Sequence, residues 1–454
     1  MNTYDKEEID MLKPILSVYT GFFSGGARNV HTDLISKIAE TDFPQVVISM
    51  ADEVDRGFEG RQKMTDDSNY KRLLSEGFNI ESLGLDTPEE QINHSAVQVM
   101  AGKLLEIDPS VILSLKEQPV KLLVEANKYL ETHGYTPYPI IVTLHRTDPE
   151  VQDPAAIDML REIEHTPQDK KHILGYLACA ESATIAYKRV LGLENEVADR
   201  FDFIPNGIDL DLFQPSSDET IQNFIDDRIP DITKETPLVI IGARNSKEKN
   251  IDLFVASAVE FLEQRPDAHV VMCGSGMEHE KLSGLIDDKA AAFDSDKLSS
   301  IKSRIHPIGR LSREEMVTLA TISNIVALTS PTLGEADPLV LKEGMACGAI
   351  PVSTCTGDMA GVAGIDNPTD HYLKPIEEPF IVGTRGIVTS QNASDIAAAW
   401  QYGIDNPDEF LDNIKAYRGE MDQEKFVNSY VQAITNMCSK KDYVAKTKEF
   451  QLDY

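Results

Sequence analysis

The chain has 454 residues, of which 41% are hydrophobic and 26% are charged, a balance typical of a globular protein with two or three domain cores. Its formal net charge of −32 argues against nucleic acid or an anionic membrane as a partner, because both bind surfaces rich in Lys and Arg. No apolar run approaches the roughly 20 residues of a membrane span. The acidic segment Met1 to Asp10 is unlike a secretory signal, and the five scattered cysteines are typical of reduced thiols. We therefore expect a cytoplasmic protein.

Short apolar runs rich in β-branched residues alternate with amphipathic stretches, a pattern typical of β-α-β units and parallel sheets. The predicted strands of the first half are Ile15–Tyr19, Gln45–Met50, Val111–Leu115, Ile140–Leu144, Gly175–Ala178 and Arg200–Ile204. Those of the second half are Leu238–Gly242, His269–Cys273, Ile305–Ile308, Asn324–Leu328 and Ile350–Val352. The predicted helices between them include Arg28–Glu40, Val120–His133, Asn250–Gln264, Arg313–Thr321 and Pro338–Ala346.

The segment from Pro205 to Pro237 is rich in Pro, Asp and Ser and lacks strong periodicity, so it is the best candidate for a domain boundary. We expect two doubly wound α/β domains, residues 1–208 and 209–429, with a C-terminal helix at about 430–454 that packs back on the first domain. Ligands of such sheets bind at the carboxyl ends of the strands. The pattern therefore predicts a ligand cleft between the two domains.

The segment from Ser330 to Val352 carries the strongest motif, in which Glu335 precedes a predicted helix and Glu343 lies within it. It resembles the donor signature of retaining GT-B glycosyltransferases, above all family 4 (glycosyl transferases group 1), whose fold is two Rossmann-like domains facing each other across a cleft. The resemblance implies that Glu335 holds hydroxyls of the transferred sugar and that Glu343 holds the ribose of the nucleotide. Leu339 and Val340 are expected to contact the donor as well.

This motif departs from the family pattern at Asp337-Pro338, where Phe-Gly is usual. Proline has no amide hydrogen to donate to a sugar, and Asp337 adds a carboxylate beside Glu335. We count Asp337 among the expected donor contacts.

Two cations, Arg244 and Lys249, lie on a polar turn between a predicted strand and a helix. Cations in this place suit a pyrophosphate, on which negative charge grows as the glycosidic bond breaks. The turn resembles the Arg and Lys pair of the family, with Asn250 where glycine is more usual, and Lys247 is expected to be a bystander. We assign Arg244, Lys249 and Glu335 to catalysis, together with His145 at the end of a strand, which the resemblance places near the donor sugar.

Glycines after strands let a backbone approach a phosphate closely. Gly25 and Gly26 follow the first strand and resemble the N-terminal glycine loop of the family, while Gly274, Ser275 and Gly309 resemble the turns near the nucleotide base. We expect all five to bind the donor.

The acceptor is predicted from scattered cations of the first half, namely Arg28, Arg61, Lys63 and Arg146. Arg61 and Lys63 lie in a long polar stretch that is either a solvated loop or a lid over a phosphorylated or carboxylated acceptor. The acidic excess of residues 1–150 argues for a soluble acceptor.

The predicted function is transfer of a hexosyl unit, with retention and without a metal, from a UDP- or GDP-linked sugar to a soluble small or phosphorylated acceptor. We expect no cofactor, no nucleic acid and no stable membrane association, and leave a homodimer open. The alternatives are a phosphorylase or disaccharide synthase on the same scaffold, a nucleotide-sugar epimerase, and a non-catalytic subunit that binds a nucleotide sugar.

Overall fold

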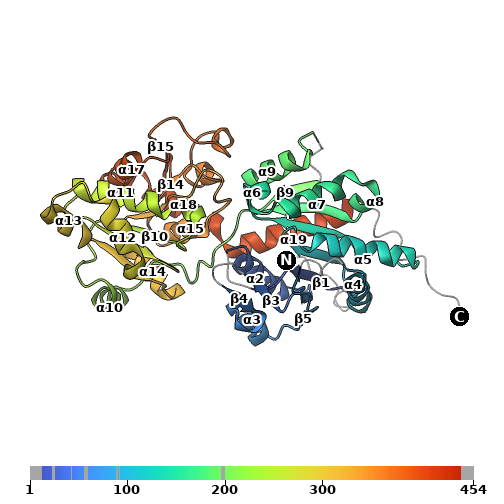
Figure 1. Ribbon diagram of the computed structural model, residues 1–454. Coiled ribbons are helices and arrows are strands. Elements are labelled where there is room, and N and C mark those ends of the chain that lie inside the picture. Colours follow the sequence, from blue (N-terminus) through green and yellow to red (C-terminus); the bar gives the residue numbers. More distant parts are fainter. Residues whose placement is uncertain are drawn as a thin grey trace. The chain divides into compact units, whose positions relative to one another are not determined.

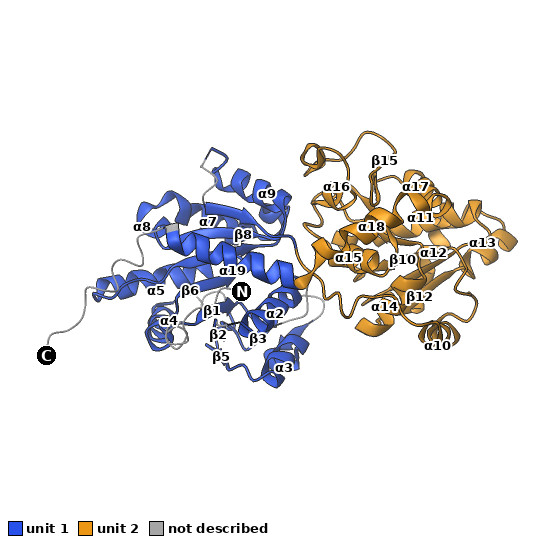
Figure 2. Ribbon diagram, turned by 180° about the vertical axis from the view of Figure 1, so that it is seen from behind, with its two compact units in different colours: residues 1–205, 424–454 blue, residues 206–423 orange. Residues whose placement is uncertain are grey.

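A computed structural model describes residues 13–22, 26–41, 43–55, 60–87, 90, 93–195 and 200–440. The chain divides into two compact units, unit 1 from Met1–Pro205 with Glu424–Tyr454 and unit 2 from Asn206–Gln423 (Figures 1 and 2). Each unit contains a seven-stranded sheet with helices packed on it. The predicted α/β class with two Rossmann-like sheets is confirmed.

The sheet of unit 1 has the order β5-β2-β1-β6-β7-β8-β9, with all neighbouring strands parallel. Its strands are β1 (Ile15–Tyr19), β2 (Gln45–Ser49), β5 (Ile80–Ser82), β6 (Val111–Leu115), β7 (Ile140–Leu144), β8 (Ile173–Ala178) and β9 (Phe201–Phe203). Helices of this unit include α2 (Gly26–Ala39), α4 (His94–Ile107), α5 (Val120–Thr132), α7 (Pro154–His165), α9 (Glu181–Leu191) and α19 (Gln423–Lys440). The central strands β1, β6, β7 and β8 are buried at every residue, which explains their continuous apolar runs.

The sheet of unit 2 has the order β12-β11-β10-β13-β14-β16-β15, and only β15 runs antiparallel to its neighbour among these strands. Its strands are β10 (Leu238–Gly242), β11 (His269–Cys273), β12 (Ile305–Gly309), β13 (Ile325–Leu328), β14 (Ile350–Thr354), β15 (Phe380–Val382) and β16 (Ile387–Thr389). The helices include α11 (Ile251–Gln264), α12 (His279–Lys289), α13 (Ser295–Lys302), α14 (Arg313–Ile322), α15 (Leu339–Ala346), α17 (Ala393–Asp405) and α18 (Leu411–Tyr417). Trp400 of α17 packs against Phe254 and Phe261 of α11 in the core.

The predicted boundary segment contains a helix that the sequence analysis did not predict, α10 (Asp218–Arg228). Its N-cap Ser217 accepts a hydrogen bond from the backbone of Thr220. Ile221, Phe224 and Ile225 are buried in the core of unit 2. The helix is short and carries few apolar residues, so its periodicity was weak, and the units divide at the start of the segment, after Pro205.

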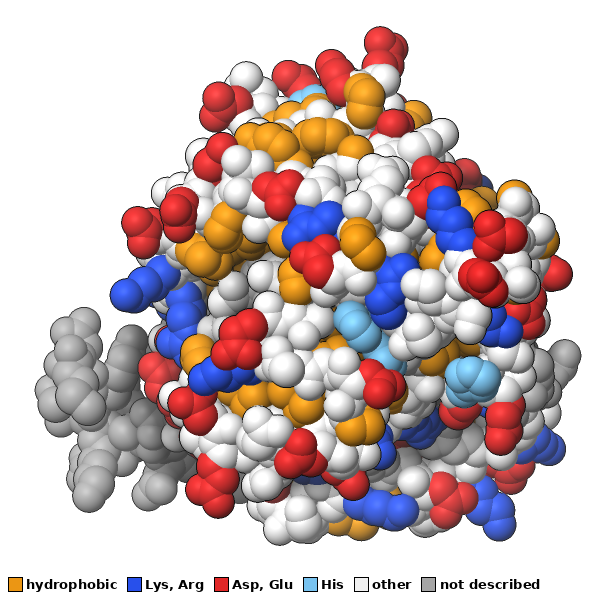
Figure 3. All heavy atoms as spheres, turned by 90° about the vertical axis from the view of Figure 1, so that its left-hand side faces the viewer, with side chains coloured by type: hydrophobic (Ala, Val, Ile, Leu, Met, Phe, Trp, Pro, Cys, Tyr) orange, Lys and Arg blue, Asp and Glu red, His pale blue; other side chains and the backbone are white. Residues whose placement is uncertain are grey.

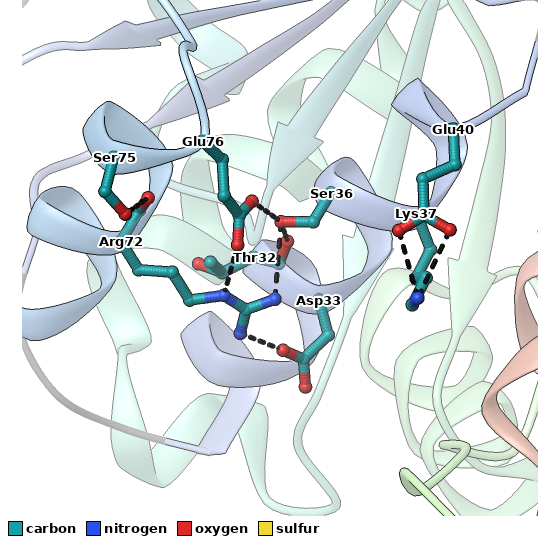
Figure 4. A network of polar contacts seen from close by, with 8 residues as sticks. All are labelled: Thr32, Asp33, Ser36, Lys37, Glu40, Arg72, Ser75 and Glu76. Atoms are coloured by element: carbon teal, nitrogen blue, oxygen red, sulfur yellow. Dashed lines mark hydrogen bonds and ion pairs between the residues drawn. The ribbon is translucent and has the colours of Figure 1, made fainter. Parts of the chain in front are cut away.

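The polar stretch after β2 forms a hairpin, β3 (Glu53–Asp55) and β4 (Arg61–Lys63), followed by helix α3 (Ser68–Ser75). Figure 4 shows how α3 is fixed to α2: the Arg72 guanidinium pairs with Asp33 and Glu76, and Ser36 donates a hydrogen bond to Glu76. Arg72 therefore has a structural role within unit 1. Residues 56–59 at the turn of the hairpin lie outside the described residues.

Helix α19 packs within unit 1, and the part of the predicted C-terminal helix from 441 to 454 lies outside the described residues. Tyr430 and Met437 of α19 are buried, and a Cβ built on Gly175 of β8 would lie 2.8 Å from the Met437 sulfur. The last described helix thus closes over the strands β8 and β9.

On the face that Figure 3 shows, Asp and Glu side chains are spread among Lys, Arg and small hydrophobic areas. Within the described ranges, no helix is long and apolar enough to cross a membrane. All five cysteines are free thiols, and Cys273 and Cys347 are core residues as predicted.

The close approach at Gly175 generates a stability prediction. Gly175→Ala should destabilise the protein by about 1–3 kcal/mol, because the new methyl group meets Met437 and the Arg200 carbonyl oxygen at 2.8 and 2.9 Å. Gly102→Ala in α4 is the matched control, since nothing lies within 4 Å of its Cβ, and it should stabilise by about 0.5–1 kcal/mol. Urea denaturation followed by circular dichroism measures both, and equal effects of the two variants would contradict this packing.

Candidate functional site

The strand order of unit 2 reverses between β10 and β13, which are adjacent in the sheet. Connections that leave the carboxyl ends of two such strands diverge to opposite sides, and ligands of open α/β sheets bind at this point. Arg244 and Lys249 follow β10, and Glu335 follows β13. The topology therefore brings the predicted cations and the first glutamate of the motif to one edge of one sheet.

Lys249 and Glu335 are in direct contact, with the ammonium group against carboxylate oxygen Oε1. The side chains are mostly buried, at 19% and 16% exposure. Ser330 donates a second hydrogen bond to the same oxygen at 3.2 Å, and the Glu335 amide donates to the hydroxyl of Thr356 at 3.1 Å. The carboxylate is thus held in a fixed place at the carboxyl edge of the sheet.

The backbone beside Lys249 is tied to β13. The Thr329 hydroxyl bonds with the carbonyl oxygens of Lys249 and Asn250 at 3.1 and 3.2 Å. Asn250 has φ 49°, in the left-handed region that glycine and asparagine adopt most readily. This conformation explains why asparagine can replace the glycine that the family resemblance leads one to expect.

Arg244 lies on the same loop but is exposed, and its Nη2 is 3.1 Å from Glu248 Oε1. Lys247, the expected bystander, is exposed as well. The loop thus presents one cation held against Glu335 and two exposed cations, Arg244 and Lys247.

Two glycine turns line this edge. Gly274, with φ 129°, follows β11, and a Cβ there would lie 1.9 Å from the Ala243 carbonyl oxygen. The Gly274 amide donates to the Gly309 carbonyl at 2.7 Å, and the Asn245 amide donates to the Ser275 carbonyl at 2.8 Å. The predicted donor residues Gly274, Ser275 and Gly309 are therefore brought together beside the Arg244 loop.

Helix α15 brings Glu343 to the same edge. A Cβ on Gly242, the last residue of β10, would lie 3.0 Å from Val340, so the first turn of α15, with Leu339 and Val340, packs there. Burial, together with the nearby Glu343 carboxylate, raises the pKa of Cys273 to about 12. Glu343 therefore lies near the end of β11.

Asp337 has other partners than a donor in this structure. Its side chain is 2% exposed, and its Oδ2 accepts hydrogen bonds from Lys342 Nζ at 2.5 Å and from the Asn206 amide at 2.7 Å. Lys342, 3% exposed, also donates to the Asn206 carbonyl at 2.9 Å. This buried ion pair, which the sequence analysis missed, fixes the loop between the two glutamates to the first residue of unit 2.

In unit 1, His145 and Arg146 follow β7. The His145 Nε2 lies 3.1 Å from the Thr143 hydroxyl, and burial holds the pKa of the imidazole well below its usual value. Arg28, in the first turn of α2, is buried and donates through Nε to the Gly21 carbonyl at 2.8 Å. Gly26 begins α2, and Gly25 lies outside the described residues.

The remaining predicted acceptor residues, Arg61 and Lys63, lie on β4 of the hairpin. Arg61 Nε is 2.8 Å from Glu53 Oε1, and both Arg61 and Lys63 are exposed. In the described part of the chain, no group of three or more His, Cys, Asp or Glu side chains is arranged to hold a metal ion.

The buried pair generates a second stability prediction. Lys342→Met should cost about 3–5 kcal/mol, because it leaves the Asp337 carboxylate buried without its cation. The double variant Asp337→Asn with Lys342→Met keeps an acceptor for the Asn206 amide and removes both charges, so it should recover at least half of the loss. Trp400, the single tryptophan of the chain, reports unfolding of unit 2 by fluorescence in urea. A double variant as unstable as the single one would refute the ion-pair explanation.

Residues 223–367, all in unit 2, match the family model "Glycosyl transferases group 1". The GDP-mannose-dependent monoacylated alpha-(1-6)-phosphatidylinositol monomannoside mannosyltransferase of Corynebacterium glutamicum is 21% identical over 221 residues, 45% of this chain and 53% of the relative. Alpha-monoglucosyldiacylglycerol synthase of Acholeplasma laidlawii is 31% identical over 119 residues, 26% of this chain and 29% of the relative. The chain thus covers about half of the first relative's length and under a third of the second's.

Among solved structures, Anabaena Alr3699/HepE in complex with UDP superposes with a TM-score of 0.68 at 16% identity, covering 93% of this chain and 99% of that one. At this identity the likeness concerns the fold. The predicted GT-B fold is confirmed, and the predicted resemblance to glycosyl transferases group 1 is confirmed over residues 223–367.

Proposed function

We propose that this chain is a retaining glycosyltransferase that moves a hexosyl unit from a UDP- or GDP-linked sugar to a small soluble acceptor, without a metal ion or another cofactor. The observation that carries the proposal is the contact between Lys249 and Glu335 where the strand order of unit 2 reverses. The family match over residues 223–367 supports it. The five free thiols are typical of a reducing compartment and support a cytoplasmic location.

In the proposed complex, the cationic end of the site binds the diphosphate. Lys249 supplies a compact charge, and the exposed Arg244 supplies a planar fork that can turn from Glu248 to a phosphate. The turns at Gly274 and Gly309 have no side chains in the way of a nucleotide. In a chain of net charge −32, such local cations are needed to hold an anionic donor.

The carboxylates accept hydrogen bonds from hydroxyl groups of the donor. Glu335, fixed by Ser330 and Lys249, is assigned to the transferred sugar, and Glu343 on α15 to the ribose. His145 is assigned to the sugar as a hydrogen-bonding group. Because burial keeps its imidazole uncharged at neutral pH, it adds no positive charge beside the developing oxocarbenium ion.

The proposed reaction needs no nucleophile from the protein. The bond between the anomeric carbon and the β-phosphate oxygen breaks, and the electron pair stays on the diphosphate. An acceptor hydroxyl attacks from the face that the diphosphate leaves, and its proton passes to the leaving phosphate oxygen. The products are a glycoside of unchanged anomeric configuration and a nucleoside diphosphate, whose growing charge Lys249 and Arg244 stabilise.

Removal of Lys249 tests the assignment. A thermal-shift panel of UDP, GDP and their sugars first identifies the donor, since a ligand at a hundred times its Kd stabilises by about 2.7 kcal/mol. Lys249→Ala should then lower kcat by about 100-fold or more, because its charge acts mainly on the departing diphosphate, while donor affinity falls by about tenfold or less. Lys247→Ala, on the same turn but exposed, should leave kcat unchanged. Equal turnover of the two variants would exclude this role of Lys249.

The stereochemistry gives an independent prediction. Proton NMR of the first product formed should show the anomeric configuration of the donor sugar, because attack and departure take place on one face. An inverted anomer would overturn the proposed mechanism, and release of free epimerised sugar nucleotide without transfer would favour an isomerase instead.

A further inference from the structure

Lys116 stands directly after β6, where the strand order of unit 1 reverses between β1 and β6. Its backbone has φ 67°, a left-handed conformation that is unfavourable for lysine. Two hydroxyls hold it there: the Lys116 amide donates to Thr143 Oγ1 at 3.2 Å, and the Ser114 hydroxyl donates to the Lys116 carbonyl at 2.8 Å. Backbone strain that is fixed by its surroundings is concentrated at functional sites.

Two further cations act electrostatically on the Lys116 side chain. Arg146 follows the neighbouring strand β7, and Arg28 lies on α2 after β1, on the other side of β6. Their charges act on Lys116, and the charges of all three act on His145. Arg28, Lys116 and Arg146 thus follow three adjacent strands, β1, β6 and β7, at the carboxyl edge of the sheet of unit 1.

Two of these cations, Lys116 and Arg146, are only partly compensated. Among the described residues, Lys116 Nζ has no hydrogen bond or ion pair. Arg146 Nη1 is buried without a hydrogen bond there, with Asp153 Oδ2 at 3.6 Å. Asp153 Oδ2 also accepts a hydrogen bond from Gln118 at 2.5 Å, so its charge is shared.

The other carboxyl group nearby, Glu117, is fully buried against the hydroxyl of Tyr187. Burial raises the pKa of Glu117, which weakens its ability to neutralise the cations. Burial, with Arg146 and Arg28, lowers the pKa of Lys116 to about 8, while Glu117 and Cys179 act in the opposite direction. Lys116 and Arg146 thus keep positive charge that the neighbouring carboxyl groups neutralise only in part, and such charge in an acidic chain attracts anions.

We propose that Lys116, Arg146 and Arg28 bind the phosphate group of the acceptor, which is a phosphate monoester of a sugar or polyol. This inference rests on the proposed transferase function and specifies its acceptor class. A phosphate monoester carries nearly two negative charges at neutral pH, and guanidinium groups bind its oxygens in pairs. The acceptor hydroxyl is then held at the edge of unit 1 where His145 lies.

Binding to the full chain tests the proposal without any turnover. Isothermal titration should show glucose 6-phosphate binding at least about tenfold more tightly than glucose, as expected for charge-assisted contacts. Lys116→Met should remove this difference, and Lys121→Met, which removes another lysine of unit 1, should preserve it. A wild-type chain that does not distinguish the two sugars, or a Lys116→Met variant that still does, would overturn the inference.

A lipid headgroup that ends in a phosphate monoester offers the same phosphate chemistry as a soluble sugar phosphate. Phosphatidylcholine vesicles with and without phosphatidic acid, whose headgroup is a phosphate monoester, separate these sources. Binding to glucose 6-phosphate but to neither vesicle assigns the phosphate to a soluble acceptor. Binding to phosphatidic acid vesicles that Lys116→Met abolishes assigns the phosphate to a lipid headgroup bound by the same lysine. Vesicle binding that survives Lys116→Met, without sugar phosphate binding, would contradict the proposal.

The pH dependence of glucose 6-phosphate affinity shows whether Lys116 acts through its charge or only through its place in the structure. Wild-type affinity for glucose 6-phosphate should fall as the pH rises from 7 to 9, because Lys116 loses its proton near pH 8 in the free protein while the phosphate stays doubly charged. Lys116→Arg keeps its charge throughout this range, so it should bind the probe without this fall. An unchanged pH dependence in Lys116→Arg would show that Lys116 is not the titrating contact.

Binding of glucose 6-phosphate in unit 1 can be measured independently of sugar transfer. Lys249→Ala, in unit 2, should lower kcat for transfer by about 100-fold or more and leave glucose 6-phosphate binding intact. If the chain binds the phosphate but never transfers sugar, the proposed function fails and the anion site stands. If it transfers sugar to neutral acceptors alone, the anion site fails and the transferase stands.

Discussion

The reversal of strand order in each parallel sheet is the constraint on which the rest of this structure depends. In unit 2 it lies between β10 and β13, and in unit 1 between β1 and β6. The two strands at each reversal are adjacent in the sheet but far apart in the sequence, and the loops that follow them begin at the same edge. Loop residues from distant parts of the sequence therefore lie close together. Lys249 and Glu335, 86 positions apart, are in contact for this reason. The same rule brings Arg28, Lys116 and Arg146 to one edge.

Much of this arrangement could be predicted from the sequence, because buried parallel strands are read as continuous apolar runs. The predicted strands Ile15–Tyr19, Val111–Leu115 and Leu238–Gly242 agree with β1, β6 and β10. The elements β5 and α10 were not predicted, although the edge strands β9 and β12 were. Strand β5 has only partly buried residues, and α10 buries one face with few apolar side chains. Short, half-exposed elements give periodic patterns too weak to separate from a loop.

The sequence analysis missed the Asp337–Lys342 pair and Lys116 for a different reason. Asp337 and Lys342 are five positions apart, outside the spacing at which helix neighbours pair, and their third partner, Asn206, lies far away in the sequence. Lys116 is a single lysine after a strand, and only its left-handed backbone and its neighbours distinguish it from a solvated one. Both features depend on tertiary contacts that a single sequence does not contain.

The Asp337-Pro338 departure has a physical reading that follows from these contacts. Pro338 is the N-cap of α15 and has extended backbone angles, so its missing amide hydrogen costs the helix nothing, because the first amides of a helix have no partner within it. A charged pair at Asp337 and Lys342 is costly to desolvate, yet each member is satisfied by Asn206 as well as by the other. The buried pair therefore fixes the position of the loop that carries Glu335. This loop is held at one end by Thr356 and at the other by Asn206. Such fixing favours a hydrogen bond between the Glu335 carboxylate and a sugar hydroxyl. A loop that is already ordered in the free protein loses less conformational entropy on binding, so less of the binding free energy is spent on ordering it.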